Sequence, residues 1–258
     1  MSGRKIDPDT AFPFGKISLS SQFNRGLIEM SVILHIESAT DGCSVAVSDE
    51  GQLVFDKADR EGHNNAVSLG VLVDEALSLV DSRGLKLDAV AVSEGPGSYT
   101  GLRIGVSMAK GICYGRGIKL ISVSTLKLLC VQPLLSLELP DDALLCPMID
   151  ARRMEVYSAV YDRALGEVRE IRADIVDGNT YKEYLDKHPV WFMGNGAAKC
   201  KETINHPNAH FLDDVNPEAR WMFPLAEQSF NREEFRDVAY FEPYYLKDFI
   251  AVKPKKLV

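Results

Sequence analysis

The sequence predicts an α/β protein made of two related halves, each with a mixed β-sheet flanked by helices. Each half opens with closely spaced strand-like runs that are separated by turn residues, as in a β-meander. In each half a helical segment then leads into another buried strand, which is the pattern of a crossover connection. The chain has 258 residues, a length that suits one large domain or two small ones.

The first half begins with three short runs of apolar and β-branched residues, at 32–36, 43–48 and 53–55. The sequence Asp-Glu-Gly at 49–51 predicts a hairpin turn between the last two runs. Residues 64–81 then carry apolar side chains at three- and four-residue spacing. This spacing predicts a helix that packs on the sheet.

The apolar surface of this helix extends beyond its main stripe, because Val67 and Val71 lie outside the stripe. A helix that is apolar on more than one face is buried on more than one side. We therefore expect one side to cover the sheet and another to meet a second helix, either from this chain or from a partner. The stripe itself consists of Leu69, Leu72, Val73, Ala76 and Val80.

A strand at 87–93 runs into a glycine-rich loop and then into a helix from about 101 to 116. Glycine lets a backbone turn sharply and approach a neighbour closely, and a helix N-terminus offers free N–H groups to an anion. The loop has neither the Gly-Lys-Ser/Thr of a phosphate-binding loop nor the dinucleotide pattern G-x-G-x-x-G. Phosphate binding and tight strand–helix packing both stay open. The loop residues are Gly95, Pro96, Gly97, Ser98, Tyr99, Thr100, Gly101 and Arg103.

The helix behind the loop carries small residues four positions apart, namely Gly101, Gly105, Ala109 and Cys113. Residues at this spacing share one face. Glycine inside a helix costs about 1 kcal/mol relative to alanine, so such a face usually serves the close approach of another backbone. We interpret it as a subunit interface that continues through Arg103 into the loop; packing within the chain is the alternative.

The second half repeats the pattern of strands and a crossover helix, and its last strand leads into a glycine turn at 194–196. We expect a short helix at 181–187, a loop at 200–219 and a helix at 218–230. The strand-like runs lie at 144–149, 155–161, 168–173 and 190–193.

The chain divides into a first subdomain at 30–125 and a second at 126–258, which includes the C-terminal tail. Residues 1–29 lack periodicity and the apolar core of a signal peptide. Met30 directly precedes the first strand, so we expect it to be the biological start and 1–29 to be an upstream extension.

Charge and composition restrict the classes of partner. The formal net charge is −8, and an acidic chain is a poor stand-alone binder of nucleic acid because phosphate contacts need Lys and Arg. No apolar run reaches the 18 or so residues of a membrane-spanning helix. The five cysteines form no C-x-x-C pair, which favours buried, reduced thiols in a cytoplasmic protein.

Residues 91–105, Ala-Val-Ser-Glu-Gly-Pro-Gly-Ser-Tyr-Thr-Gly-Leu-Arg-Ile-Gly, resemble the signature of the TsaB (YeaZ) family. Residues 150–157 resemble the D-A-R…E-V-Y motif of that family, and residues 194–197 resemble its G-N-G-A turn. The opening at 33–40 is similar to the family start, with Glu37 where Asp is usual. The resemblance covers residues 32 to about 200.

The resemblance implies an ASKHA fold (actin, sugar kinase and Hsp70) of two related subdomains. It also implies a heterodimer with the paralogue TsaD through helices of the first subdomain, joined by the ATPase TsaE, and an ability to self-associate. TsaD transfers the threonylcarbamoyl group to N6 of adenosine 37 in tRNAs that read codons beginning with A. Family members act as scaffold and activator, so we expect tRNA contact only through the complex.

An autonomous ATPase or phosphotransferase is the rival interpretation. Such ASKHA enzymes need an Asp-x-Gly-Thr-like turn, whereas this chain has Ser38 and Ala39 between Glu37 and Thr40, without the glycine. The equivalent turn of the second half also lacks it. We therefore expect degenerate nucleotide turns, formed by Glu37, Thr40, Asp150, Arg152, Gly194 and Gly196.

Metal and peptidase chemistry are not expected either. TsaD-type proteins bind metal through an H-x-x-x-H pair after the Gly-Pro-Gly loop, and residues 120–126 contain no histidine there. The literal pair His206 and His210 encloses Pro207 in a loop-like segment. No H-E-x-x-H, G-x-S-x-G or Cys–His arrangement occurs. We expect no catalytic residue, metal or cofactor in this chain.

Overall fold

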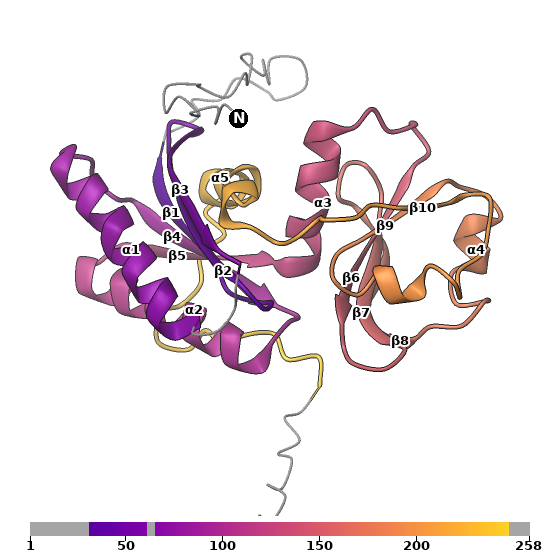
Figure 1. Ribbon diagram of the computed structural model, residues 1–258. Helices are drawn as coiled ribbons and strands as arrows, with labels where there is room; N and C mark the ends of the chain where they lie inside the picture. Colours follow the sequence, from indigo (N-terminus) through magenta and orange to yellow (C-terminus); the bar gives the residue numbers. More distant parts are fainter. Residues whose placement is uncertain (1–30, 61–64, 248–258) are drawn as a thin grey trace, which may run out of the picture.

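The computed structural model describes residues 31–60 and 65–247 of the chain. Two five-stranded sheets lie side by side, each with its own helices (Figure 1). The extension at 1–29 and the expected start at Met30 lie outside the described residues.

The first sheet has the strand order β3-β2-β1-β4-β5. β1 (Val32–Glu37), β2 (Cys43–Asp49) and β3 (Gln52–Asp59) form the predicted antiparallel meander. β4 (Ala89–Gly95) pairs in parallel with β1, and β5 (Lys119–Ser124) pairs in parallel with β4. Strands β1 and β2 are buried on both faces, which explains why apolar residues occupy both sides of each strand.

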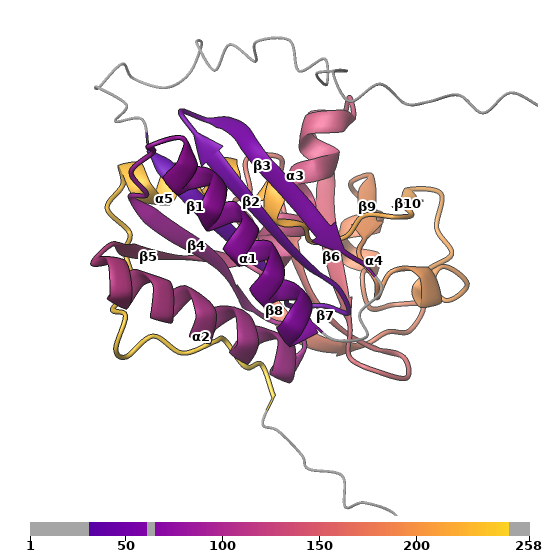
Figure 2. The same ribbon diagram turned by 60° about the vertical axis from the view of Figure 1, so that its left-hand side comes forward.

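Two long helices, α1 (Asn65–Ser82) and α2 (Tyr99–Arg116), cover one face of this sheet (Figure 2). The other face is covered by α3 (Thr125–Ser136) and α5 (Phe223–Asn231). Helix α2 begins where the Ser98 hydroxyl accepts a hydrogen bond from the Gly101 N–H, as N-cap serines do.

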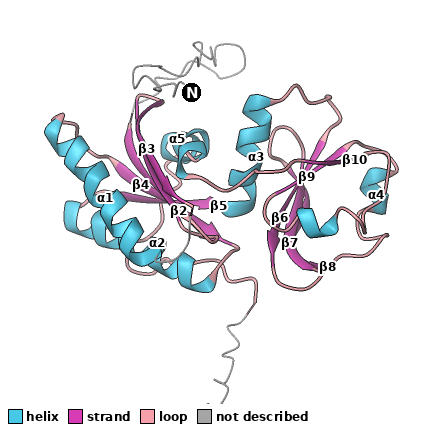
Figure 3. Cartoon of the chain, in the orientation of Figure 1, coloured by secondary structure: helices cyan, strands magenta, loops and turns pink. Residues whose placement is uncertain are grey.

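The second sheet has the order β10-β9-β6-β7-β8 and repeats the topology of the first. Its first three strands form an antiparallel meander, and β9 and β10 continue in parallel on the other side. Long helices gather on the first half, whereas the second half is mainly strands and loops (Figure 3). The predicted class of two related mixed sheets is therefore confirmed. The strands are β6 (Leu144–Asp150), β7 (Glu155–Tyr161), β8 (Glu167–Ile175), β9 (Val190–Met193) and β10 (Ala209–Phe211), with α4 at Lys182–Leu185 and a 3-10 turn at Ala198–Cys200.

Two features differ from the sequence-based expectation. The expected loop at 200–219 contains β10, a strand of three residues that is too short to show periodicity. Helix α5 falls in the second subdomain by sequence position, but it packs on the first sheet, where Met222 and Ala226 contact the cluster around Ile33. The reason is that the α3 face of the first sheet is apolar and needs a second cover.

The last described residues, 236–247, form a strap that crosses the first half and reaches the second. The Arg236 N–H donates to the Leu120 carbonyl at 2.8 Å, and the Tyr244 N–H donates to the Glu94 carbonyl at 2.7 Å. Lys247 then forms an ion pair with Glu155 at the start of β7. The strap therefore ties the end of β4 to the second sheet.

Candidate functional site

The glycine-rich loop packs against the turn between β1 and β2. The Ser98 N–H donates to the Ala39 carbonyl at 2.7 Å. A Cβ atom at Gly97 would lie closer than 3.0 Å to that carbonyl, and a Cβ at Gly101 would lie equally close to the carbonyl of Ser38. The glycines thus allow main chain to contact main chain, which is the packing interpretation of this loop.

The small-residue face of α2 is internal, so its assignment to a subunit interface is corrected. Gly101, Gly105, Ala109 and Cys113 are all buried. A Cβ at Gly105 would collide with the Ser38 hydroxyl, which donates to the Gly101 carbonyl at 2.8 Å. Four-residue spacing shows which residues share a face, but it does not show whether the sheet or a partner covers that face.

The second half uses glycine in the same way. A Cβ at Gly194 would lie closer than 3.0 Å to the Met148 carbonyl, and one at Gly196 would crowd the main chain of Ile149. The Asn195 side chain fixes this contact by accepting a hydrogen bond from the Asp150 N–H at 2.9 Å. Both glycine turns therefore let main chain pack directly on main chain, at the β1–β2 turn in the first half and at the end of β6 in the second.

Glu37 is fully buried at the end of β1. Its carboxyl group accepts a hydrogen bond from the Ala39 N–H at 2.6 Å and another from the Ser93 hydroxyl. Burial raises the pKa of Glu37 to about 8, against the lowering effect of the Ala39 and Ser38 N–H groups. The carboxyl group closes the β1–β2 turn, in which Thr40 is half-buried.

His35, two residues earlier, faces the same side of the sheet and is also buried. Its Nε2 atom lies 2.8 Å from the Ser48 hydroxyl. Burial lowers its pKa to about 3, so the ring is neutral at physiological pH.

The corresponding turn of the second half is held by Asp150. Its Oδ1 accepts a hydrogen bond from the Arg152 N–H at 2.9 Å and forms an ion pair with Lys199. Partial burial raises the pKa of Asp150, but the bonds from Lys199 and Arg152 outweigh it and the net shift is downward. Arg152 adopts a left-handed backbone with φ of 73°, and its side chain is exposed.

The outer side of α1 and α2 carries exposed apolar residues and glycines among polar ones, and no described element covers it (Figure 2). Val67 is 60% exposed, Val71 is 54% exposed and Tyr114 is 86% exposed. A Cβ atom added at Gly70 or Gly111 would have no heavy atom within 4 Å among the described residues. We call this surface the outer helix face. It comprises Val67, Gly70, Val71, Gly111, Tyr114 and Gly115.

The sequence alone indicates part of this face. Val67 and Val71 stand out as apolar residues outside the main stripe of α1. Sequence reasoning missed Gly111 and Gly115, which are also spaced four apart. The longer series from Gly101 to Cys113 has the same spacing, and the subunit interface was assigned to that series instead.

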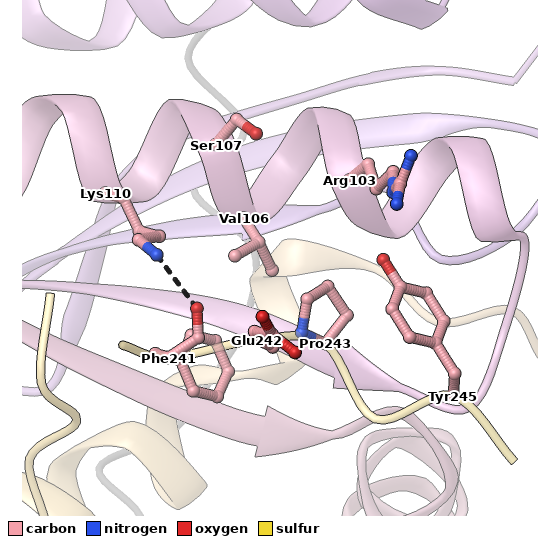
Figure 4. A pocket seen from close by; sticks show the side chains of 8 residues that line it. All are labelled: Arg103, Val106, Ser107, Lys110, Phe241, Glu242, Pro243 and Tyr245. Carbon is pink, nitrogen blue, oxygen red and sulfur yellow. Dashed lines mark hydrogen bonds between the residues drawn. The ribbon is translucent and has the colours of Figure 1, made fainter. Parts of the chain in front are cut away.

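A pocket of about 220 Å³ lies between α2 and the strap (Figure 4). The Lys110 ammonium donates to the carbonyls of Ala239 and Phe241, at 3.1 and 2.9 Å, and so fastens the strap to the helix. The lining residues are Arg103, Val106, Ser107, Lys110, Phe241, Glu242, Pro243 and Tyr245.

The described residues contain no group of three or more His, Cys, Asp or Glu side chains arranged to hold a metal ion. His206 lies 3.5 Å from Asp186, whereas the ring of His210 stacks on Trp191. Within the described ranges, no helix is long and apolar enough to cross a bilayer. All five cysteines are free and buried, which confirms the prediction of buried thiols.

Residues 60–254 match the family model described as TsaD, tRNA N6-adenosine threonylcarbamoyltransferase. The match spans most of the chain, so the chain belongs to this family of ASKHA-fold proteins. The protein named tRNA threonylcarbamoyladenosine biosynthesis protein TsaB from Escherichia coli is 28% identical over 231 residues, which are 86% of this chain and 96% of the relative. The Bacillus subtilis protein of the same name is 28% identical and covers 67% of this chain and 74% of its own length.

Among solved structures, YeaZ from Pseudomonas aeruginosa superposes with a TM-score of 0.65 at 24% identity. The superposition covers 84% of this chain and all of that chain, and it supports the ASKHA-type fold. Within the larger family, the chain is a member of the TsaB (YeaZ) branch.

Proposed function

We propose that this chain is a non-catalytic subunit that docks the paralogue TsaD and supports threonylcarbamoylation of N6 of adenosine 37 in tRNA. The tRNAs are those that read codons beginning with A, and TsaE joins the assembly in the cytoplasm. Support comes from the relatives, which are named as proteins of threonylcarbamoyladenosine biosynthesis. The net charge of −8 agrees with tRNA contact through another subunit.

The observation that carries this proposal is the outer helix face. Val67 and Val71 expose more than half of their surface on adjacent turns of α1. Burying a valine side chain stabilises a complex by about 1.5–3 kcal/mol. The glycines at 70, 111 and 115 would let a partner's helices approach these backbones closely. A pair of helices from a related fold fits such a surface.

The rival activity, autonomous ATP hydrolysis or phosphoryl transfer, has less support. Glu37 stands where an ASKHA enzyme has its acidic turn residue, but its carboxyl group is buried and bonded to Ala39 and Ser93. Gly97 and Gly101 press the loop onto that turn. A triphosphate would have to displace these contacts.

Titration calorimetry of this chain with TsaD of the same organism tests the proposal, comparing wild type with Val71→Asp. The aspartate would place a carboxylate in an apolar contact, and burying an unpaired charge is costly. We expect binding to weaken roughly a hundredfold, or about 2.8 kcal/mol at 1.4 kcal/mol per tenfold. The matched control is Ile175→Asp, because Ile175 is 75% exposed on β8 in the other half.

The same two variants belong in a modification assay with TsaD, TsaE and the enzyme that makes threonylcarbamoyl-adenylate. Val71→Asp should lower modification and Ile175→Asp should not. Modification that proceeds undiminished without this chain would refute the proposal. Gel filtration of the chain alone shows whether a second copy covers the same face, in which case Val71→Asp would also yield the monomer.

A further inference from the structure

The pocket between α2 and the strap contains a cation that is held in place before any partner arrives. The Arg103 guanidinium lies over the ring of Tyr99, 4.3 Å from its centroid. The hydroxyl of Tyr245 in the strap, close to Arg103, raises the pKa of the guanidinium. Tyr99 and Tyr245 themselves pack together, with ring centroids 4.9 Å apart. Arginine that is fixed in this way loses little conformational entropy when it binds.

Arg103 has no ion pair within 4.0 Å among the described carboxylates. Glu242 lies in the same pocket and acts on it only at longer range. Lys110, the second cation, already donates to two carbonyls of the strap. The pocket therefore offers one fixed guanidinium that no described carboxylate pairs with, in a chain whose net charge is −8.

Pocket size decides between two kinds of anion. Sites for small molecules and cofactors measure about 300–1,000 Å³, whereas this pocket measures about 220 Å³. It is too small for a nucleotide, but it accommodates the end of a side chain. The guanidinium fork matches a carboxylate through two parallel hydrogen bonds.

The position of the pocket connects it with the outer helix face. Arg103, Ser107 and Gly111 are four residues apart on α2 and all three are exposed. The Arg103 and Ser107 side chains both line the pocket, with Ser107 on the side of α2 that faces away from the strap (Figure 4), and Gly111 belongs to the outer helix face. A partner that covers the face would therefore meet the pocket at its edge.

We propose that this pocket receives an aspartate or glutamate side chain of the protein docked on the outer helix face, with Arg103 as its ion-pair partner and the Ser107 hydroxyl as an additional donor. This inference rests on the proposed function, because it requires a partner on that face. It gives the strap a role, since Tyr245 packs against Tyr99, over whose ring the guanidinium lies.

Calorimetry with the full chain and TsaD of the same organism tests the pocket. Arg103→Gln should weaken binding about tenfold and flatten the salt dependence of the affinity, since it removes a charge pair. The affinity of Arg103→Lys should lie between those of Arg103→Gln and wild type, because lysine keeps the charge and loses the two-pronged guanidinium geometry. Glu242→Gln removes a competing carboxylate and should bind at least as tightly as wild type. The control is Arg172→Gln, an exposed arginine of β8 that pairs only with Glu170 among the described residues.

Charge reversal identifies the partner's residue. Arg103→Glu should abolish binding, and one Asp→Lys or Glu→Lys change on TsaD should restore it. The inference is overturned if Arg103→Gln binds like wild type, if Glu242→Gln weakens binding as much as Arg103→Gln, or if no reversal on TsaD restores Arg103→Glu. When Val71→Asp weakens binding and Arg103→Gln does not, only the pocket inference fails. When wild type does not bind TsaD, the proposed function fails with it.

Discussion

Gly101→Ala would place a methyl group closer than 3.0 Å to the carbonyl oxygen of Ser38. This oxygen belongs to the main chain and cannot rotate away, so the turn or the helix must shift. Overpacking of this kind costs about 1–3 kcal/mol. The shift also strains the neighbouring bond from the Ser98 N–H to the Ala39 carbonyl, which is worth about 1 kcal/mol.

Alanine is favoured over glycine inside a helix by about 1 kcal/mol, so the expected net loss is about 1–3 kcal/mol. For a chain of this size, 1 kcal/mol changes Tm by about 2–4 °C, so Gly101→Ala should lower Tm by about 2–12 °C. Gly105→Ala meets the Ser38 hydroxyl instead. That group can rotate, but it would give up its bond to the Gly101 carbonyl, so the loss should be smaller.

Gly111→Ala is the control on the same helix. A Cβ atom at this position would have no described heavy atom within 4 Å, and alanine is favoured over glycine inside a helix by about 1 kcal/mol. Its Tm should rise by about 2–4 °C. Thermal unfolding followed by circular dichroism compares the three variants with wild type. If the small-residue face were external, all three would gain stability, and such a result would refute the internal packing.

Two further predictions concern ionisation. Because burial raises the pKa of Glu37 to about 8 from its ordinary 4.5, the unfolded state binds fewer protons and stability should fall as pH rises from 4.5 to 8. The pKa of His35 is lowered to about 3 from 6.5, so its contribution to stability is lost as pH falls from 6.5 to 3. Urea unfolding between pH 6.5 and 8.5 therefore isolates the effect of Glu37. Glu37→Gln should remove the slope of stability against pH in this range, and an unchanged slope would contradict the assignment. All five thiols are buried and burial raises the pKa of each, so a disulfide reagent should label them at least tenfold more slowly in the native protein than in denaturant; one fast-reacting thiol in the native state would argue against the packing.

Periodicity predicted most of the regular elements. The strands of both meanders follow from short apolar runs bounded by turn residues. The helix expected from about 101 begins at Tyr99, because the Ser98 hydroxyl caps it. The extra apolar residues Val67 and Val71 are both more than half exposed, so the expectation that a second helix covers this side of α1 stays a prediction.

Periodicity could not predict which element of the fold covers each apolar or small-residue helix face. The stripe from Gly101 to Cys113 shows that something approaches α2, and only the three-dimensional arrangement shows that β1 and β4 do so. The same ambiguity placed α5 in the second half. The strap has no repeat at all, and its hydrogen bonds run to residues more than 100 positions away.

The placement of α5 has a consequence for synthesis on the ribosome. The cluster around Ile33, Ala89 and Ile121 is completed by Met222 and Ala226, yet β5 ends at Ser124 and α5 begins at Phe223. At 5–20 residues per second, translation of the intervening stretch takes roughly 5–20 s. During that interval the nascent first sheet has an open apolar side, so a factor that shields exposed hydrophobic surface would act on it before the entire second sheet has emerged.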